Sequence, residues 1–231
     1  MSKTALQIAQ DVALRIGQSV PSLLFGSDAR TESELRSAMI EAAAKIVHAH
    51  DWAVLKTIKT NAGDGSTTEY ALPSDYLRMP KDGQVWSTKW QAPLEAIYPE
   101  AWLGLDVMDF DAVCGVWTIY GGNVVYRPAL AADENAKFWY VSENAVLDSG
   151  STAKAEFTAD DDTFRLDDRT LYLMTIAEWR RAKGLDYAEE MRDADTALAQ
   201  AIDRDKGARI LRQGSRRAMS AKIAYPFEVT P

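Results

Sequence analysis

The sequence is poor in the residues that build disulfide frameworks and metal centres. It has one cysteine, Cys114, and two histidines, His48 and His50, in 231 residues. A single cysteine excludes an internal disulfide framework and a cysteine-rich zinc site. Cys114 stands in the apolar stretch DAVCGVW, so we expect a buried structural thiol there.

Long apolar runs are also missing. None approaches the ~20 residues that a membrane-spanning helix needs. Polar residues interrupt the N-terminal stretch MSKTALQIAQDVALRIG too often for a signal-peptide core. We therefore expect a protein that is made in the cytoplasm and has no membrane partner.

Acidic residues outnumber basic residues, and the formal net charge is −8. General nucleic-acid binders usually carry a basic footprint, so the balance disfavours DNA binding by the whole chain. The charge is uneven, because the tail from residue 208 to 231 holds five basic residues and one acidic residue. An acidic body with a basic tail needs an explanation.

The N-terminal part carries two helix patterns. Thr4 and Gln7 form a capping-box pair ahead of an amphipathic stretch, and Gly17 predicts where that helix ends. Thr31 and Glu34 form a similar pair ahead of a second amphipathic stretch. Each apolar stripe needs a partner to cover it.

The C-terminal part predicts a helical hairpin. Asp167 is a suitable cap for a helix that is apolar on almost every side, and Gly184 predicts its end. Asp186 predicts the start of the next helix. The basic and acidic residues of EWRRAKGLDYAEEM then match the dipoles of the two helix ends that meet at this turn.

The middle of the chain has the pattern of short strands. Several segments between residues 54 and 143 are rich in β-branched and aromatic residues and are separated by Gly, Pro, Asp and Asn. In WTIYGGNVVYRP, Gly121 or Gly122 can take the positive φ of a tight hairpin turn.

These patterns predict an α+β fold. We expect an antiparallel helical bundle formed by the N- and C-terminal parts, with an inserted antiparallel β-rich domain and an extended C-terminal tail. The predicted segments are 1–52 for the first helices, 53–166 for the inserted domain, 167–207 for the hairpin that completes the bundle, and 208–231 for the basic tail.

Catalytic and metal-binding patterns are weak. His48 and His50 are two positions apart, so they diverge on a helix and cannot share a metal while the helix continues. Ser151 and Lys154 match S-x-x-K but lie in a loop-like stretch without the companion motifs. No catalytic residue, cofactor site or metal site is predicted.

Two further features have ordinary structural interpretations. The acidic stretch 160–168 fails the calcium-loop template, since Phe164 falls on a ligand position, and an acidic loop leading into a helix cap explains it. Trp86, Trp117 and Trp139 lie in strand-like segments and Trp179 in the apolar helix. We interpret these tryptophans as core residues rather than as a base-stacking surface.

The order of several segments resembles a known family. The segments are TALQIAQDVALRIG, YALPSDYLRMP, WTIYGGNVVYRPAL, FWYVSENAV, FRLDDRTLYLMTIAEWRRAKGLDYAEE and RDKGARIL, which run in order over roughly residues 4–211. The chain resembles the head-to-tail adaptor (connector or head completion) proteins of tailed bacteriophages, including the tail tubular A type.

The resemblance implies a structural virion protein and no enzyme. Copies would form a ring, commonly of twelve, below the portal protein. The ring would extend the DNA channel, help to retain the genome and dock tail or nozzle proteins. Genomic DNA would pass without sequence-specific binding, and an acidic wall suits such passage.

The tail offers contact groups for the portal or a neighbouring protomer. Arginines can form bidentate bonds with acidic side chains, and an alternating apolar segment suits a groove or sheet edge. The hypothetical interface residues are Arg209, Arg212, Arg216, Arg217, Tyr225 and Phe227. Two alternatives stay open: a metal-dependent enzyme or binder that uses His48 and His50, and a small nucleic-acid-binding module that uses the basic tail.

Overall fold

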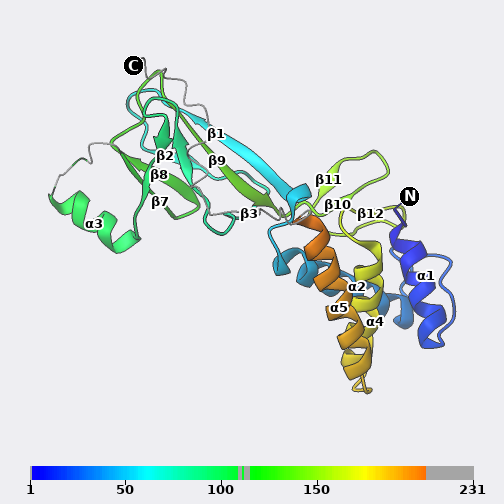
Figure 1. The fold of residues 1–231 in the computed structure, drawn as a ribbon. Helices are drawn as coiled ribbons and strands as arrows, with labels where there is room; N and C mark the ends of the chain where they lie inside the picture. Colours follow the sequence, from blue (N-terminus) through cyan, green and yellow to red (C-terminus); the bar gives the residue numbers. More distant parts are fainter. Residues whose placement is uncertain (1, 109–110, 112–114, 207–231) are drawn as a thin grey trace, which may run out of the picture.

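The chain folds into two units joined end to end. A computed structural model describes residues 2–108, 111 and 115–206. A helical unit and a β-rich unit lie at opposite ends of the described chain, and the long strands β1 and β9 reach from one toward the other (Figure 1). Cys114 lies outside the described residues.

The helices and strands alternate in blocks along the chain. The helices are α1 (Ala5–Ile16), α2 (Arg30–Ala49), the short 3-10 turn η1 (Ala53–Leu55), α3 (Pro99–Met108), α4 (Asp168–Ala182) and α5 (Ala188–Asp205). The strands are β1 (Lys56–Ala62), β2 (Glu69–Ala71), β3 (Tyr76–Arg78), β4 (Val85–Ser87), β5 (Ala92–Pro93), β6 (Glu95–Ala96), β7 (Val116–Tyr120), β8 (Asn123–Arg127), β9 (Asn135–Ser142), β10 (Val146–Leu147), β11 (Ala153–Lys154) and β12 (Thr163–Phe164). The α+β class predicted from the sequence is confirmed.

Local sequence signals fix both ends of α1. The Thr4 side chain accepts from the Gln7 backbone N–H, and the Gln7 side chain accepts from the Thr4 N–H, so the capping box is complete. Gly17 ends the helix with a left-handed φ of 71°. At α4, the Asp167 carboxylate accepts from the Thr170 backbone N–H, which confirms the predicted cap.

The predicted start of α2 was wrong. The helix begins at Arg30, and its N-cap residue Ala29 makes no side-chain cap bond, so Thr31 lies inside the first turn. Glu34 does not act as the partner of Thr31 in a capping box. Its carboxylate pairs with Arg30 and with Lys183 of the α4–α5 turn, and this tertiary contact takes the place of the local cap.

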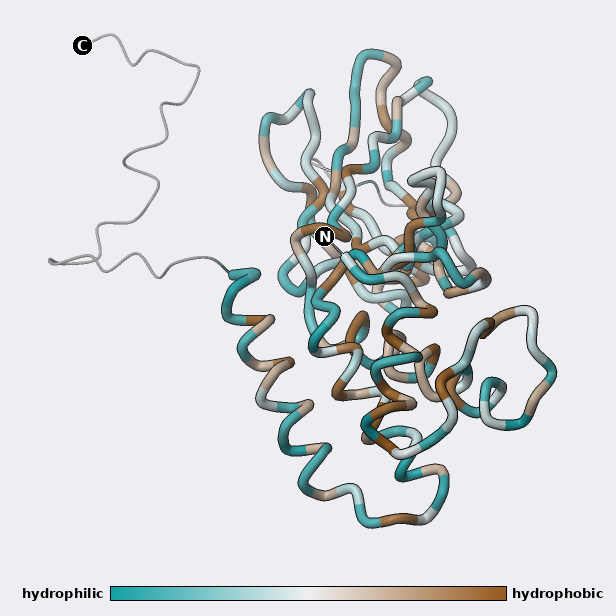
Figure 2. Tube along the Cα trace, turned by 90° about the vertical axis from the view of Figure 1, so that its right-hand side faces the viewer, coloured by the Kyte–Doolittle hydropathy of each residue, from teal (hydrophilic) through white to brown (hydrophobic). Residues whose placement is uncertain are grey.

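The two ends of the chain share one hydrophobic core. It is built by α1, α2, α4 and α5. Hydrophobic positions gather toward the middle of the helical unit in Figure 2. Helix α2 runs antiparallel to α4, because Glu34 pairs with Lys183 whereas Lys45 pairs with Glu178. Helix α1 starts beside the start of α4, where the Lys3 N–H donates to Asp168 (2.8 Å).

A small sheet extends the helical core. Strands β11, β10 and β12 form a three-stranded sheet in that order. Its residues Val146 and Phe164, together with the nearby Phe157, are buried in the same cluster as the helices. Thr4 also forms an isolated bridge with Thr163, which ties the start of α1 to β12.

The β-rich unit is a sandwich of two sheets. In the first sheet β9 is central: β1 pairs along one edge, β4 and β3 share the other edge, and β5 follows β4. The second sheet has the order β2-β8-β7-β6, with β6 parallel to β7 and the other pairs antiparallel. Gly121 and Gly122, both at positive φ, form the predicted turn between β7 and β8.

Alternate residues of the two sheets meet in the sandwich core. Phe138 and Tyr140 of β9 pack in one cluster with Trp117 and Tyr126 of the second sheet. The Asn61 side-chain amide donates to the Tyr126 hydroxyl (3.0 Å). Burial raises the pKa of Tyr126 and outweighs this hydrogen bond, which lowers it.

Helix α3 was missed by the sequence reasoning. It lies on the outer side of the second sheet, where Trp102 packs against Val116 and Val125. In the part of the chain that the structure describes, no helix is long and apolar enough to span a bilayer.

Candidate functional site

The predicted interface residues cannot be placed on the fold. They lie in the segment 207–231, which is outside the described residues. These residues are Arg209, Arg212, Arg216, Arg217, Tyr225 and Phe227.

The two histidines do not form a site together. His48 is exposed near the end of α2, whereas His50 follows the helix and packs edge-on against Trp52 at 5.2 Å between ring centroids. Nε2 of His50 lies 3.2 Å from Oδ2 of Asp205. Among the described residues, no three His, Cys, Asp or Glu side chains are grouped as metal ligands. His50 contributes instead to the contact between helices α2 and α5.

The carboxylates of the acidic stretch 160–168 accept hydrogen bonds that hold neighbouring segments together. The Asp160 carboxylate accepts from the backbone N–H groups of Leu24 and Phe25 (3.0 and 2.8 Å). The fully buried Asp162 accepts from the N–H groups of Thr158 and Ala159, and its other oxygen lies 2.6 Å from Nζ of Lys154.

The S-x-x-K match has no catalytic arrangement. Besides the Asp162 carboxylate, Nζ of Lys154 contacts the Thr158 hydroxyl (2.6 Å), so both contacts of the lysine are with residues of the loop that follows it. Ser151 lies in a turn with a left-handed φ of 65°. The Lys154 ammonium balances the buried Asp162 carboxylate, which is a structural duty.

A polar joint connects the helical and β-rich units. Arg78 of β3 donates from Nε to Oδ1 of Asp51 (3.0 Å) and from Nη2 to the backbone oxygen of His50 (2.8 Å). The Lys81 N–H donates to the other Asp51 oxygen (2.8 Å). Burial raises the pKa of Asp51, but the bonds from Lys81 and Arg78 outweigh it and hold the pKa below the ordinary value.

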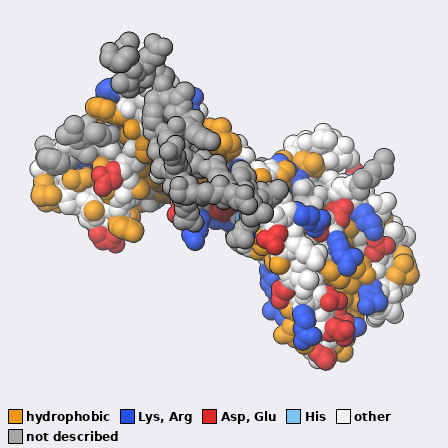
Figure 3. Space-filling model, viewed as in Figure 1, with side chains coloured by type: hydrophobic (Ala, Val, Ile, Leu, Met, Phe, Trp, Pro, Cys, Tyr) orange, Lys and Arg blue, Asp and Glu red, His pale blue; other side chains and the backbone are white. Residues whose placement is uncertain are grey.

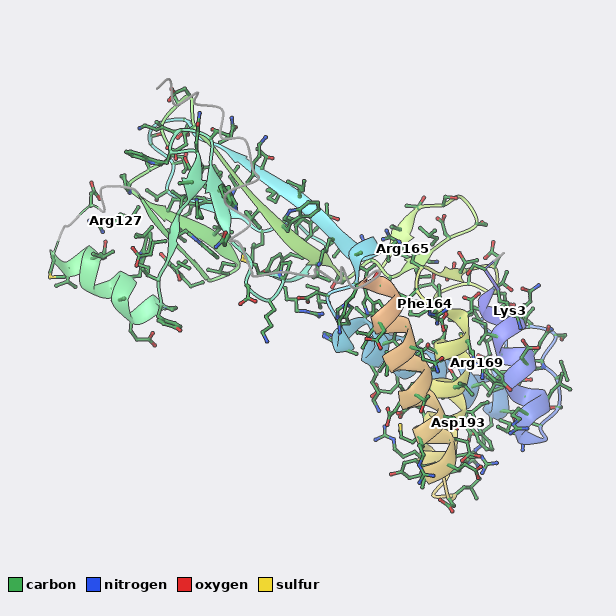
Figure 4. All side chains as sticks on the ribbon, in the orientation of Figure 1. Lys3, Arg127, Phe164, Arg165, Arg169 and Asp193 are labelled. Carbon is green, nitrogen blue, oxygen red and sulfur yellow. The ribbon has the colours of Figure 1, made fainter. Side chains whose placement is uncertain are left out.

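Two more polar contacts complete the joint. The Asp205 carboxylate at the end of α5 accepts from the Ala53 N–H at the entry to β1 (3.0 Å to Oδ2). Arg165, which lies where the two units meet (Figure 4), donates to the backbone oxygens of Asn144 (2.6 Å) and Val54 (2.9 Å). In each of these bonds a charged side chain meets a backbone group, so the bonds are charge-assisted and tie the side chains to the chain segments where the units meet.

The outer face of the first sheet is an apolar groove with a basic border. The tryptophan groove, as we call it, has a volume of about 720 Å³. No described helix or strand covers its aromatic side chains, since Trp86 and Trp139 are 49% and 51% exposed. Its main residues are Ile58, Trp86 and Trp139, with Lys56, Lys81 and Lys137.

The interpretation of Trp86 and Trp139 as core residues was wrong, whereas Trp117 and Trp179 are buried as expected. The signal was present in the alternation of β9. Phe138 and Tyr140 point into the sandwich, so the residue between them must point out. Aromatic content predicted a strand correctly but could not say which face of the strand is covered.

The helical unit presents a different surface. Basic and acidic side chains are interspersed over the face shown in Figure 3, with no large patch of one sign. Beneath this surface, the buried Glu178 carboxylate pairs with Lys45 of α2 (2.5 Å) and with Arg181 of its own helix (2.6 Å). The pair with Lys45 joins the N-terminal part of the chain to the C-terminal part.

The described residues thus form two units held by a polar joint, and no described element covers the apolar groove on one of them. Comparison with known proteins gives the family. Residues 3–225 match the model of the SU10 adaptor protein family, and the chain belongs to this family of bacteriophage head-to-tail adaptors. No curated protein matches the chain. The protein therefore has a structural role in the virion, in an oligomeric assembly with portal and tail components.

Proposed function

We propose that twelve copies of this protein form a ring below the portal. The ring extends the DNA channel, helps to retain the packaged genome and docks tail or nozzle proteins. The observation that carries the proposal is the family match over residues 3–225, nearly the whole chain. The joint between the units supports it, because a ring of fixed diameter needs protomers of fixed shape.

The charge of the chain suits a channel. A net charge of −8 with the basic residues enriched in the tail leaves an acidic body. Such a wall repels the negatively charged DNA backbone, so DNA slides past it without sequence-specific binding. The same charge makes protomers repel one another, and a portal that presents many sites at once overcomes this repulsion through effective concentration.

We further propose a division of labour along the chain. Segments 1–52 and 167–207 supply the helices of the helical unit. Segment 53–166 supplies the inserted β-rich domain and, in its last part, the small sheet of β10, β11 and β12 that packs on those helices. The basic tail 208–231 anchors the protein to the portal or a neighbouring protomer. The tail residues proposed for this contact are Arg209, Arg212, Arg216, Arg217, Tyr225 and Phe227.

Assembly on purified portal rings tests the proposal. Mass photometry of the full chain, with and without portal, is expected to show rings mainly in the presence of portal. A chain that ends at Gly207 is expected to keep its melting temperature and to lose stable attachment. Equal ring formation without portal would contradict the template role, and unchanged attachment of the shortened chain would contradict the role of the tail.

A further inference from the structure

The β sandwich has two outer faces, and helix α3 covers part of one of them. Along β7 and β8, Val116 and Val125 point outward and lie under α3, whereas Trp117 and Tyr126 point into the sandwich. Along β9, the buried Phe138 and Tyr140 point inward, so residues 137 and 139 point outward on the other side. Helix α3 and the tryptophan groove therefore lie on opposite sides of the same sandwich.

Helix α3 shows apolar side chains to solvent. Its inner side is anchored by Trp102, and Arg127 holds it from the sheet through Asp106 (3.2 Å; Figure 4). On its outer side Leu103 and Val107 are 63% and 84% exposed. They are four residues apart and lie on one face of the helix. Exposed apolar side chains grouped in this way mark an interaction site.

The charges of the helix and of the groove are opposite. Helix α3 carries Glu100 and Asp106 and has no basic residue. Glu100 is exposed and lies three residues before Leu103, so it shares the outer face. The tryptophan groove is bordered by three lysines and a single acid, Asp82. A convex, apolar, acidic helix thus matches a concave, apolar, basic groove in both shape and charge.

We propose that α3 of one copy docks in the tryptophan groove of the next copy. One chain cannot make this contact with itself, because the two surfaces are on opposite sides of one sandwich. The contact is head-to-tail, so each copy offers a free helix and a free groove, and a chain of such contacts closes into a ring when the rotation permits. The proposal rests on the proposed ring and names the surfaces that form it.

Exchange of charges between copies tests the pairing. In the full-length variant Lys137→Glu, a glutamate in the groove of one copy would face Glu100 of the next copy. In Glu100→Lys, a lysine on the helix would face Lys137 of the groove. Each variant is expected to give at least about tenfold fewer rings on portal by mass photometry, because like charges meet at every contact. An equal mixture of the two variants is expected to restore rings to within about twofold, since reversed helices meet reversed grooves.

The control is Leu14→Glu, which changes a 65% exposed apolar residue of α1 in the other unit and is expected to leave ring yield unchanged. A mixture that stays as deficient as the single variants would overturn the proposal. Absence of rings from the unmodified chain on portal would overturn the proposed function itself. If the unmodified chain forms rings on portal but mixing the two variants does not raise the ring yield, the α3–groove pairing is overturned and the proposed ring is not.

Photo-crosslinking separates the possible occupants of the groove. A benzophenone amino acid in place of Val107, in rings made from a mixture of isotopically light and heavy protomers, is expected to link to peptides that contain Trp86 or Trp139 of a different copy. The reverse experiment places the benzophenone at position 86. Links from position 86 to the segment 207–231, or to a portal peptide, in place of α3 would overturn the assignment of the groove to α3.

Discussion

Replacement of Glu178 and of its partners should have unequal effects on stability. The Glu178 side chain is 2% exposed, whereas Lys45 and Arg181 are 36% and 48% exposed. If both cations are replaced by methionine, the carboxylate stays buried without a partner, and the expected cost is about 3–5 kcal/mol. If Glu178 is replaced by methionine, the cations return to water and the apolar side chain fills the site, so the expected cost is below about 1 kcal/mol.

Urea unfolding followed by far-ultraviolet circular dichroism measures these costs, because the helical unit supplies most of the helix signal. Glu41→Gln is the control. Glu41 is 53% exposed and lies 3.6 Å from Lys45, so its loss should change the free energy of unfolding by less than about 0.5 kcal/mol. A Glu178→Met variant as unstable as the double cation variant would refute the reasoning, since exposure would then not decide the cost.

Three other predictions concern the joint, the sandwich core and the first helix end. Asp51→Asn should cost about 1–2 kcal/mol at pH 7. Because the Asp51 pKa lies below its ordinary value of 3.8, the difference in unfolding free energy should persist above pH 3.8 and shrink as the pH falls through the folded-state pKa. A pH-independent difference in urea unfolding would contradict this. Asn61→Ala should cost about 1–3 kcal/mol because it leaves the Tyr126 hydroxyl without its donor, and Tyr126→Phe should remove most of that penalty in a double-mutant cycle. Gly17→Ala should lower stability by about 1 kcal/mol, measured by thermal unfolding, because alanine resists the left-handed φ of 71°.

The sequence predicted the features that depend on neighbouring residues. Thr4 with Gln7, Asp167, and the glycine pair 121–122 act within a few positions, and all appear as expected. The association of both chain ends was also predictable, because each amphipathic stripe had no partner in its own half. In each case the pattern had a single physical solution.

The failures arose where a distant contact decided the outcome. Glu34 looked like a partner of Thr31 but pairs with Lys183, which is remote in sequence. Helix α3 has apolar residues on two sides, one on the sheet and one facing solvent, so it lacks the single stripe that predicts a surface helix. Both candidate surfaces of the β-rich unit were missed, because hydrophobicity predicts burial and cannot distinguish a core from an interface that awaits its partner.

The position of the joint gives the proposed ring a mechanical consequence. Contacts between neighbouring β sandwiches would fix the angle from one copy to the next, while contacts of the helical unit with other components lie at the far side of the joint. The joint must then carry any force between the two sets of contacts. It is held by bonds to Asp51, Asp205 and Arg165, beside the apolar contacts that Val141 of β9 makes with the helical core. Polar bonds of this kind are directional, so they resist a change of angle more than they add to overall stability. A change at Asp51 should therefore alter the shape of the protomer, and with it ring closure, at a smaller cost in folding free energy than an equally disruptive change in either core.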